Sequence, residues 1–149
     1  MGETTLLIGK PTSEFLQVRI IRRGAPDATD YWDGNWLVGG VSLKVGGFSG
    51  NFEADFRTTD FARFESALGA LYRTLTGQAE LKTDEEQLGI TVIGDGHGHF
   101  EARCVARDEA GIGNLLDFTL QFDQTEIPAI LTQLEHIASQ FPIRGAPAA

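Results

Sequence analysis

Apolar and polar residues alternate with a period of two along most of this chain. Successive side chains of a β-strand point to opposite faces, so the pattern is typical of strands with one buried and one solvent-facing side. It predicts six strands, at about residues 16–22, 37–45, 48–57, 88–92, 100–107 and 116–123. Strands that alternate so regularly favour an antiparallel sheet over a parallel sheet buried on both faces.

Two other segments show the longer period of a helix. Their apolar residues recur every three or four positions and therefore fall on one helix face. These residues are Phe61, Phe64, Leu68, Leu71 and Leu75 in the first segment, and Ile127, Ile130, Leu131, Leu134, Ile137 and Phe141 in the second. We expect Thr59 and Thr125 to cap the two helix N-termini. Gly77 is placed to end the first helix, and Pro142 to end the second.

A group of strands is followed by a helix in each half of the chain. This repeated order predicts an α+β fold, with one antiparallel sheet of about six or seven strands that carries both helices on one face. A length of 149 residues suits one domain, residues 1–149. We expect an ordered core over about residues 4–142 and a disordered tail over 143–149.

The composition is that of a globular protein, with 42% hydrophobic and 22% charged residues. A chain of this size buries enough surface to fold without a disulfide or a metal. Cys104 is the single cysteine, and its alternating surroundings predict a small buried hydrophobe in a reducing compartment. The first eight residues do not resemble a signal peptide, and no apolar run is long enough to span a membrane. We therefore expect a cytoplasmic protein with no membrane partner.

The net charge of −9 has the opposite sign to the basic surface that binds nucleic acid. Nucleic acid is therefore not an expected partner. A basic protein partner would suit this charge, because long-range attraction speeds association. The charge is equally explained by solubility alone, which requires no partner.

One loop contains the residue types of a transition-metal site: Asp95, His97 and His99. The loop is rich in glycine and lies between two predicted strands, and Asp95-Gly96 is a strong hairpin signal. No further ligand is evident, and no serine or cysteine lies in a recognised nucleophile motif. We expect a non-enzymatic protein without cofactor or metal. A metal-dependent, hydrolase-like enzyme that uses this loop stays open as an alternative.

The segment from Asp30 to Trp36 contains both tryptophans and one of the two tyrosines, interleaved with carboxylates and an amide. This mixture is typical of binding surfaces, because rings offer large apolar faces and polar groups add directional contacts. It is also typical of a tight turn that leads into a strand. The candidate partner-binding residues are Asp30, Tyr31, Trp32, Asp33, Asn35 and Trp36, with Asp108 and Glu109 from the polar turn between two later strands.

The same segment, continued to Leu37, resembles the signature of the WapI-type immunity proteins, a family of small bacterial proteins. Other pieces match in order: Gly46–Gly50 with Phe52 and Arg57, then Phe64 to Gly77, Gly94–His99, Ala106–Asp108 with Gly113-Asn114, and Asp123–Thr125 with Pro128. The resemblance covers about residues 30–138 and fits the first 25 residues least well. It implies protection of a cell against the toxic domain of a contact-delivered, wall-associated toxin.

The favoured function is therefore a bacterial immunity protein that binds and neutralises a cognate toxin domain of basic charge. The other alternative is a binding or scaffold domain, as a monomer or a homodimer, with no link to a toxin. The pattern of residues does not predict the oligomeric state.

Overall fold

The computed structural model describes residues 4–147, and within them eight strands form two four-stranded antiparallel sheets. The first sheet contains β1 (Thr4–Gly9), β2 (Phe15–Arg23), β3 (Trp36–Val45) and β4 (Phe48–Arg57). The second contains β5 (Thr76–Lys82), β6 (Leu88–Asp95), β7 (His99–Arg107) and β8 (Leu115–Asp123). Helix α1 (Thr58–Thr74) joins the sheets, and a short 3-10 turn, η1 (Gln124–Glu126), precedes helix α2 (Ile127–Gln140). In each sheet the strands follow one another in chain order.

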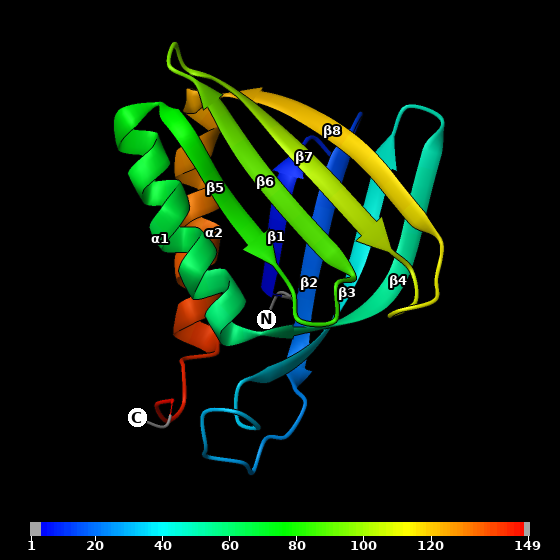
Figure 1. Ribbon diagram of the computed structural model, residues 1–149, viewed down its shortest axis with the longest axis vertical. Helices are drawn as coiled ribbons and strands as arrows, with labels where there is room; N and C mark the ends of the chain where they lie inside the picture. Colours follow the sequence, from blue (N-terminus) through cyan, green and yellow to red (C-terminus); the bar gives the residue numbers. More distant parts are fainter. Residues whose placement is uncertain (1–3, 148–149) are drawn as a thin grey trace.

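The α+β class and the repeated order of strands followed by a helix are confirmed, but the prediction of a single sheet is wrong. The inner faces of the two sheets contribute to one apolar core (Figure 1). Alternation along a strand shows that one face is buried, but it does not show whether helices or a second sheet cover that face. That is why the same pattern suited both arrangements.

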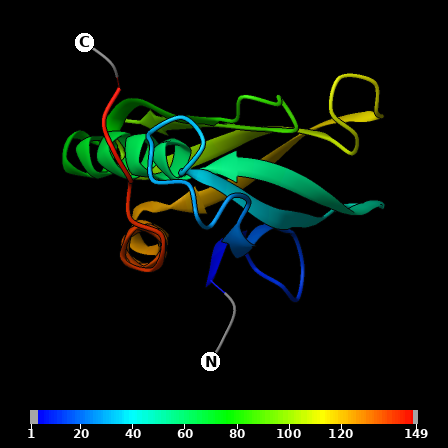
Figure 2. The same ribbon diagram turned by 90° about the horizontal axis from the view of Figure 1, so that it is seen from below.

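The helices border the sheets at one side of the molecule instead of covering a whole face. Helix α2 packs along β1 and α1 packs along β5, and the two helices also contact each other. Figure 2 shows the two sheets extending away from this pair of helices. β1 and β5, the two strands that the pattern did not predict, are the edge strands beside the helices.

The predicted apolar helix faces are buried as expected. Phe61, Phe64, Leu68 and Leu71 of α1 are all buried, and so are the α2 residues Ile127, Ile130, Leu134 and Ile137. Cys104 is fully buried in the second sheet, and burial raises the pKa of its thiol to about 12. Such a thiol behaves as a small hydrophobe, as the sequence predicted.

The helix ends differ from the prediction. The N-cap of α1 is Arg57, not Thr59, and the Arg57 backbone N–H donates to the Asp60 carboxylate at 2.8 Å. The chain leaves α1 through Leu75 in the left-handed region (φ 65°), two residues before Gly77. Asp123, not Thr125, caps the turn before α2, since its carboxylate accepts from the Thr125 N–H. Ser, Thr and Asp all make good caps, so the choice among neighbouring candidates depends on the local chain path.

Candidate interaction surface

The segment Asp30–Trp36 forms a compact turn before β3. The Gly34 N–H donates to the Asp30 carbonyl at 2.9 Å, and the Asp33 N–H donates to the Asp30 carboxylate at 3.0 Å. A Cβ on Gly34 would lie 2.5 Å from the Asp30 oxygen and 2.8 Å from the Ala28 oxygen. Glycine is therefore required here by close backbone approach.

Asn35 lies at the centre of this turn and is fully buried. Its Nδ2 donates to the carbonyls of Tyr31 at 2.8 Å and Arg144 at 2.9 Å. Its Oδ1 accepts from the Arg144 backbone N–H at 2.8 Å. Both amide hydrogens and the carbonyl oxygen thus have partners, as buried polar groups require. The amide joins the turn to a residue 109 positions away in the chain.

Arg57, at the end of β4, lies against all three rings of the segment. Its guanidinium carbon is 5.5 Å from the ring centre of Tyr31, 5.4 Å from that of Trp32 and 5.2 Å from that of Trp36. It also donates to the Tyr31 carbonyl at 2.8 Å. Cation–π attraction and this hydrogen bond hold the rings in place. Trp32 nevertheless keeps 57% of its surface exposed, so it is the ring a partner can reach.

Two further arginines tie the chain after α2 to the loop before β3. Arg23 donates to the carbonyls of Gly34 and Pro142. Burial, with a smaller effect from the charge of Arg144, lowers the pKa of Arg23. Arg144 donates through Nη1 to the carbonyls of Pro26 and Ala28. Arg144, which lies within the predicted disordered tail over 143–149, has four hydrogen bonds. Residues 148 and 149 of that tail lie outside the described residues.

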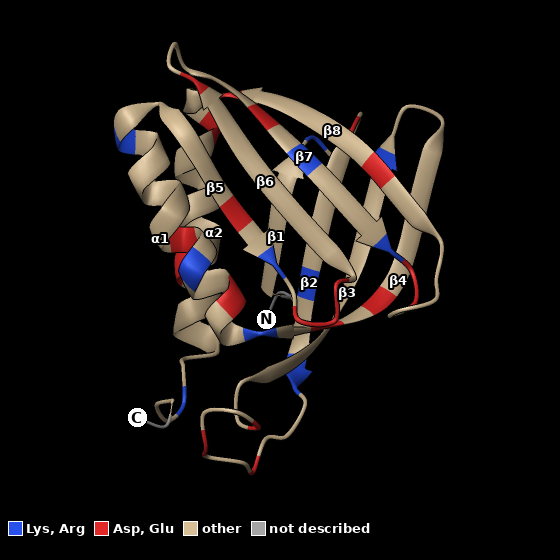
Figure 3. Cartoon of the chain, viewed as in Figure 1, with Lys and Arg blue, Asp and Glu red and all other residues tan. Residues whose placement is uncertain are grey.

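The other predicted contact residues, Asp108 and Glu109, lie in a separate place. They begin the loop between β7 and β8, on the side of the molecule away from the helices, whereas the Asp30–Trp36 turn lies near the C-terminal end of the chain (Figures 1 and 2). Hydrogen bonds from the side chain and backbone of Asn114 hold the pKa of Asp108 below its usual value. Figure 3 shows further acidic residues on the β5–β6 loop and along β4.

The loop with Asp95, His97 and His99 joins β6 to β7. The Asp95 carboxylate accepts from the backbone N–H groups of His97 at 2.7 Å and His99 at 3.1 Å. The His97 N–H in particular holds the pKa of Asp95 below its usual value. Within residues 4–147, no group of three or more His, Cys, Asp and Glu residues is arranged to hold a metal ion. The carboxylate of this loop shapes the hairpin.

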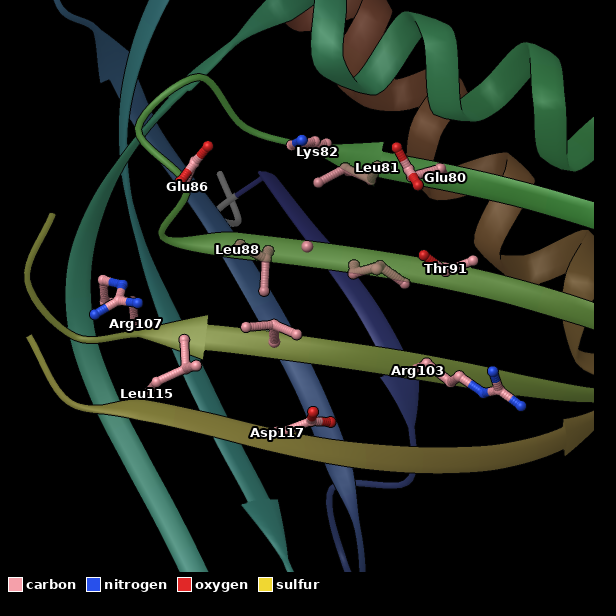
Figure 4. Close-up of a pocket in the computed structure, with 13 residues that line it drawn as sticks. Glu80, Leu81, Lys82, Glu86, Leu88, Thr91, Arg103, Arg107, Leu115 and Asp117 are labelled. Atoms are coloured by element: carbon pink, nitrogen blue, oxygen red, sulfur yellow. The ribbon is translucent and has the colours of Figure 1, made fainter. Parts of the chain in front are cut away.

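A shallow hollow of about 510 Å³ lies on the outer face of the second sheet and was not predicted. Gly89 lies in its floor and pairs with Lys82 on one side and Val105 on the other. Figure 4 shows both acidic and basic side chains around it, among them Glu80, Arg103 and Asp117. The mixed charge indicates no single class of ligand. A glycine within an alternating strand was the one sequence signal for this hollow.

Among the described residues, no helix is long and apolar enough to cross a membrane.

Comparison with protein-family models gives one match, the Immunity protein WapI-like family, over residues 6–142. The match includes the N-terminal strands that the motif resemblance did not cover. Comparison with curated proteins gives no match. Among solved structures, MRP1/MRP2 of trypanosoma bruciei share 15% identity at a TM-score of 0.46, covering 93% of this chain and 86% of theirs. The siderocalin Ex-FABP shares 10% identity at a TM-score of 0.27, covering 99% and 92%. Both TM-scores are too low to show a shared fold.

Proposed function

We propose that this chain, which belongs to the Immunity protein WapI-like family, is a non-enzymatic, cytoplasmic protein that binds the toxin domain encoded beside it and blocks its action. Family membership over residues 6–142 supports an immunity role and is the observation that carries the proposal. An inhibitor of this kind requires a stable, complementary surface and no catalytic group. The net charge of −9 suits a toxin whose substrate groove is basic.

The exposed members of the predicted contact set provide two patches for such binding. The turn patch consists of Asp30, Trp32 and Asp33, and the hairpin patch consists of Asp108 and Glu109. The remaining predicted residues, Tyr31, Asn35 and Trp36, hold the turn together through the contacts described above. A protein interface of standard size involves about 20–30 residues on each side, so either patch would be one part of a larger contact surface.

The test is co-expression with the toxin domain encoded beside this gene. We expect cells that produce the toxin domain to survive only when this chain is present, and we expect the two purified proteins to form a stable complex. The control is a family member from another locus, which should not protect. Continued toxicity, or survival without a physical complex, would contradict the proposal and favour the scaffold alternative.

Trp32→Ala is expected to weaken toxin binding by about 30-fold or more, as the loss of an exposed aromatic anchor does. The free energy of unfolding should fall by only about 1 kcal/mol, because the ring is more than half exposed. Calorimetric titration and thermal unfolding measure the two effects. Tyr72→Ala, which removes an exposed ring from α1, is the matched control. Equal affinity of the Trp32 variant and the wild type would show that the turn patch has only a structural role.

A further inference from the structure

The first half of β4 leaves its inner face uncovered. Phe48, Phe52 and Phe56 all point to the inner side, where the second sheet packs, because side chains two apart share a face. Phe56 is fully buried, Phe52 is half-buried and Phe48 is 65% exposed. β4 is the outermost strand of its sheet (Figure 1). The core is therefore open at the hairpin end of β4.

The backbone of β4 is also open along this edge. Bonded and non-bonded pairs alternate in an antiparallel ladder, and the bond from the Thr58 N–H to the Asn35 carbonyl identifies that pair as bonded. By the same register, the even-numbered residues of β4 bond to β3. The odd-numbered residues turn their N–H and C=O groups away from β3, and they include Ser49, Asn51, Glu53 and Asp55. The Gln87 side chain donates to the Glu53 carbonyl at 3.1 Å, which agrees with this assignment.

A groove of about 410 Å³ lies beside this edge, between β4 and the β7–β8 hairpin. Its lining is mostly apolar and includes Phe48, Phe52, Leu115 and Leu116. Leu115 is 54% exposed, like Phe48 across the groove. Asp108 is the one charged residue of this lining, and hydrogen bonds from Asn114 hold its pKa below the usual value.

The hairpin half of β4, residues 48–52, lacks the features that usually protect an edge strand. It contains no proline and no charged residue, and it pairs with β3 without a register shift. A long, regular edge with exposed apolar residues beside it is the surface to which other proteins add a strand.

We propose that an extended segment of the toxin domain adds to the edge of β4 in this groove. The inference rests on the proposed function and names the surface that it uses. The segment would pair with the free backbone groups of Ser49 and Asn51, and Gln87 would limit it to about five residues. Its inward side chains would be apolar, because they meet Phe52 and Leu116. A lysine or arginine would lie beside Asp108.

A second copy of this chain fits the groove less well. In another copy, β3 lies beside β4, so β3 would have to enter the groove together with the added strand. The β7–β8 hairpin, which lines the other side of this groove, leaves little room for it. Two chains of net charge −9 also repel each other. A single extended segment with a basic residue is narrow enough for the groove and is attracted by the negative charge of this chain.

The backbone test is Ser49→Pro, which removes an outward N–H while no ladder bond is lost. We expect the affinity for the toxin domain to fall at least about tenfold, with thermal unfolding almost unchanged. Thr119→Pro makes the same change on the edge of β8, outside the groove, since Thr119 also faces away from its neighbouring strand. The control should bind like the wild type.

The charge test compares Glu109→Lys, in the hairpin patch, with Glu135→Lys, exposed on α2. The two variants change the net charge equally, so long-range attraction is matched. We expect about tenfold weaker binding for Glu109→Lys and less than about threefold for Glu135→Lys.

These outcomes separate the two proposals. If the wild type, Ser49→Pro and Glu109→Lys all bind the toxin domain equally tightly, the proposal that the toxin binds in this groove is wrong. The proposed immunity function is then unaffected. Failure of the wild type to bind the toxin domain would overturn both. If the wild type self-associates in sedimentation and Ser49→Pro does not, the groove binds a second copy of this chain and the proposal of a toxin segment is wrong.

Discussion

Asn35→Ala is expected to lower the free energy of unfolding by about 3 kcal/mol or more. The side chain is fully buried and makes three hydrogen bonds, to the Tyr31 carbonyl and to the backbone carbonyl and N–H of Arg144. Alanine leaves the backbone carbonyl and N–H of Arg144 without these partners, at about 1–3 kcal/mol for each group that water does not reach. The Tyr31 carbonyl keeps the hydrogen bond from Arg57. Denaturant unfolding at constant protein concentration measures the loss.

Two variants calibrate this result. Asn114→Ala removes an amide whose bond to Asp108 is exposed, and it should cost less than about 1 kcal/mol. Asn35→Asp keeps the size of the side chain but directs a carboxylate oxygen at two carbonyls, so it should not rescue stability. A loss below about 1 kcal/mol for Asn35→Ala would mean that water replaces the amide and that the turn is not held by it.

Asp60→Asn is expected to remove a pH dependence of stability worth about 3 kcal/mol. Asp60 is buried at the N-terminus of α1, and burial raises the pKa of its carboxyl to about 6 from an ordinary 3.8. The hydrogen bond from the Arg57 N–H opposes this rise, Asp84 adds to it, and the charges of Arg63 and Arg57 oppose it. A rise of about two units corresponds to about 3 kcal/mol of differential proton binding.

The raised pKa determines the direction of the effect. Between about pH 4 and pH 6 the folded protein holds a proton on Asp60 that the unfolded chain does not, so stability rises as pH falls through this window and is lost as pH rises through 6. Unfolding in denaturant at pH 4, 5, 6 and 7 should show the wild type gaining stability relative to Asp60→Asn as pH falls. Asp95→Asn is the opposite control: its folded pKa is lowered, so the wild type should lose stability relative to that variant at low pH. A constant difference between wild type and Asp60→Asn would contradict the prediction.

The elements themselves were largely predictable from the chain. Six of the eight strands and both helices follow from periods of two and of three to four residues, because those periods report which face is buried. The strands β1 and β5 were missed. β1 is short and β5 has only Ala79 and Leu81 on its buried face, so neither gives a long alternating run.

The candidate site was predictable only in part. The aromatic and polar residues of the segment Asp30–Trp36 marked it as a candidate in the sequence. In the structure, the rings of Tyr31 and Trp36 pack against Arg57, and Asn35 bonds to backbone groups of Tyr31 and Arg144. The roles of Arg23, Arg57 and Arg144 were not predicted, because an isolated arginine in a sequence resembles any solvated cation. Their carbonyl and ring partners lie up to 119 positions away.

The sequence by itself determined the family motif, the α+β class, the repeated order of strands and helix, and the buried face of most elements. Only the tertiary structure decided that the strands divide into two sheets, that the chain after α2 binds the turn around Asn35, and that β4 faces an open groove. Periodicity is a local property, set by the geometry of one strand or helix. Which layer covers a face, and which edge stays unpaired, depends on contacts between residues far apart in the chain.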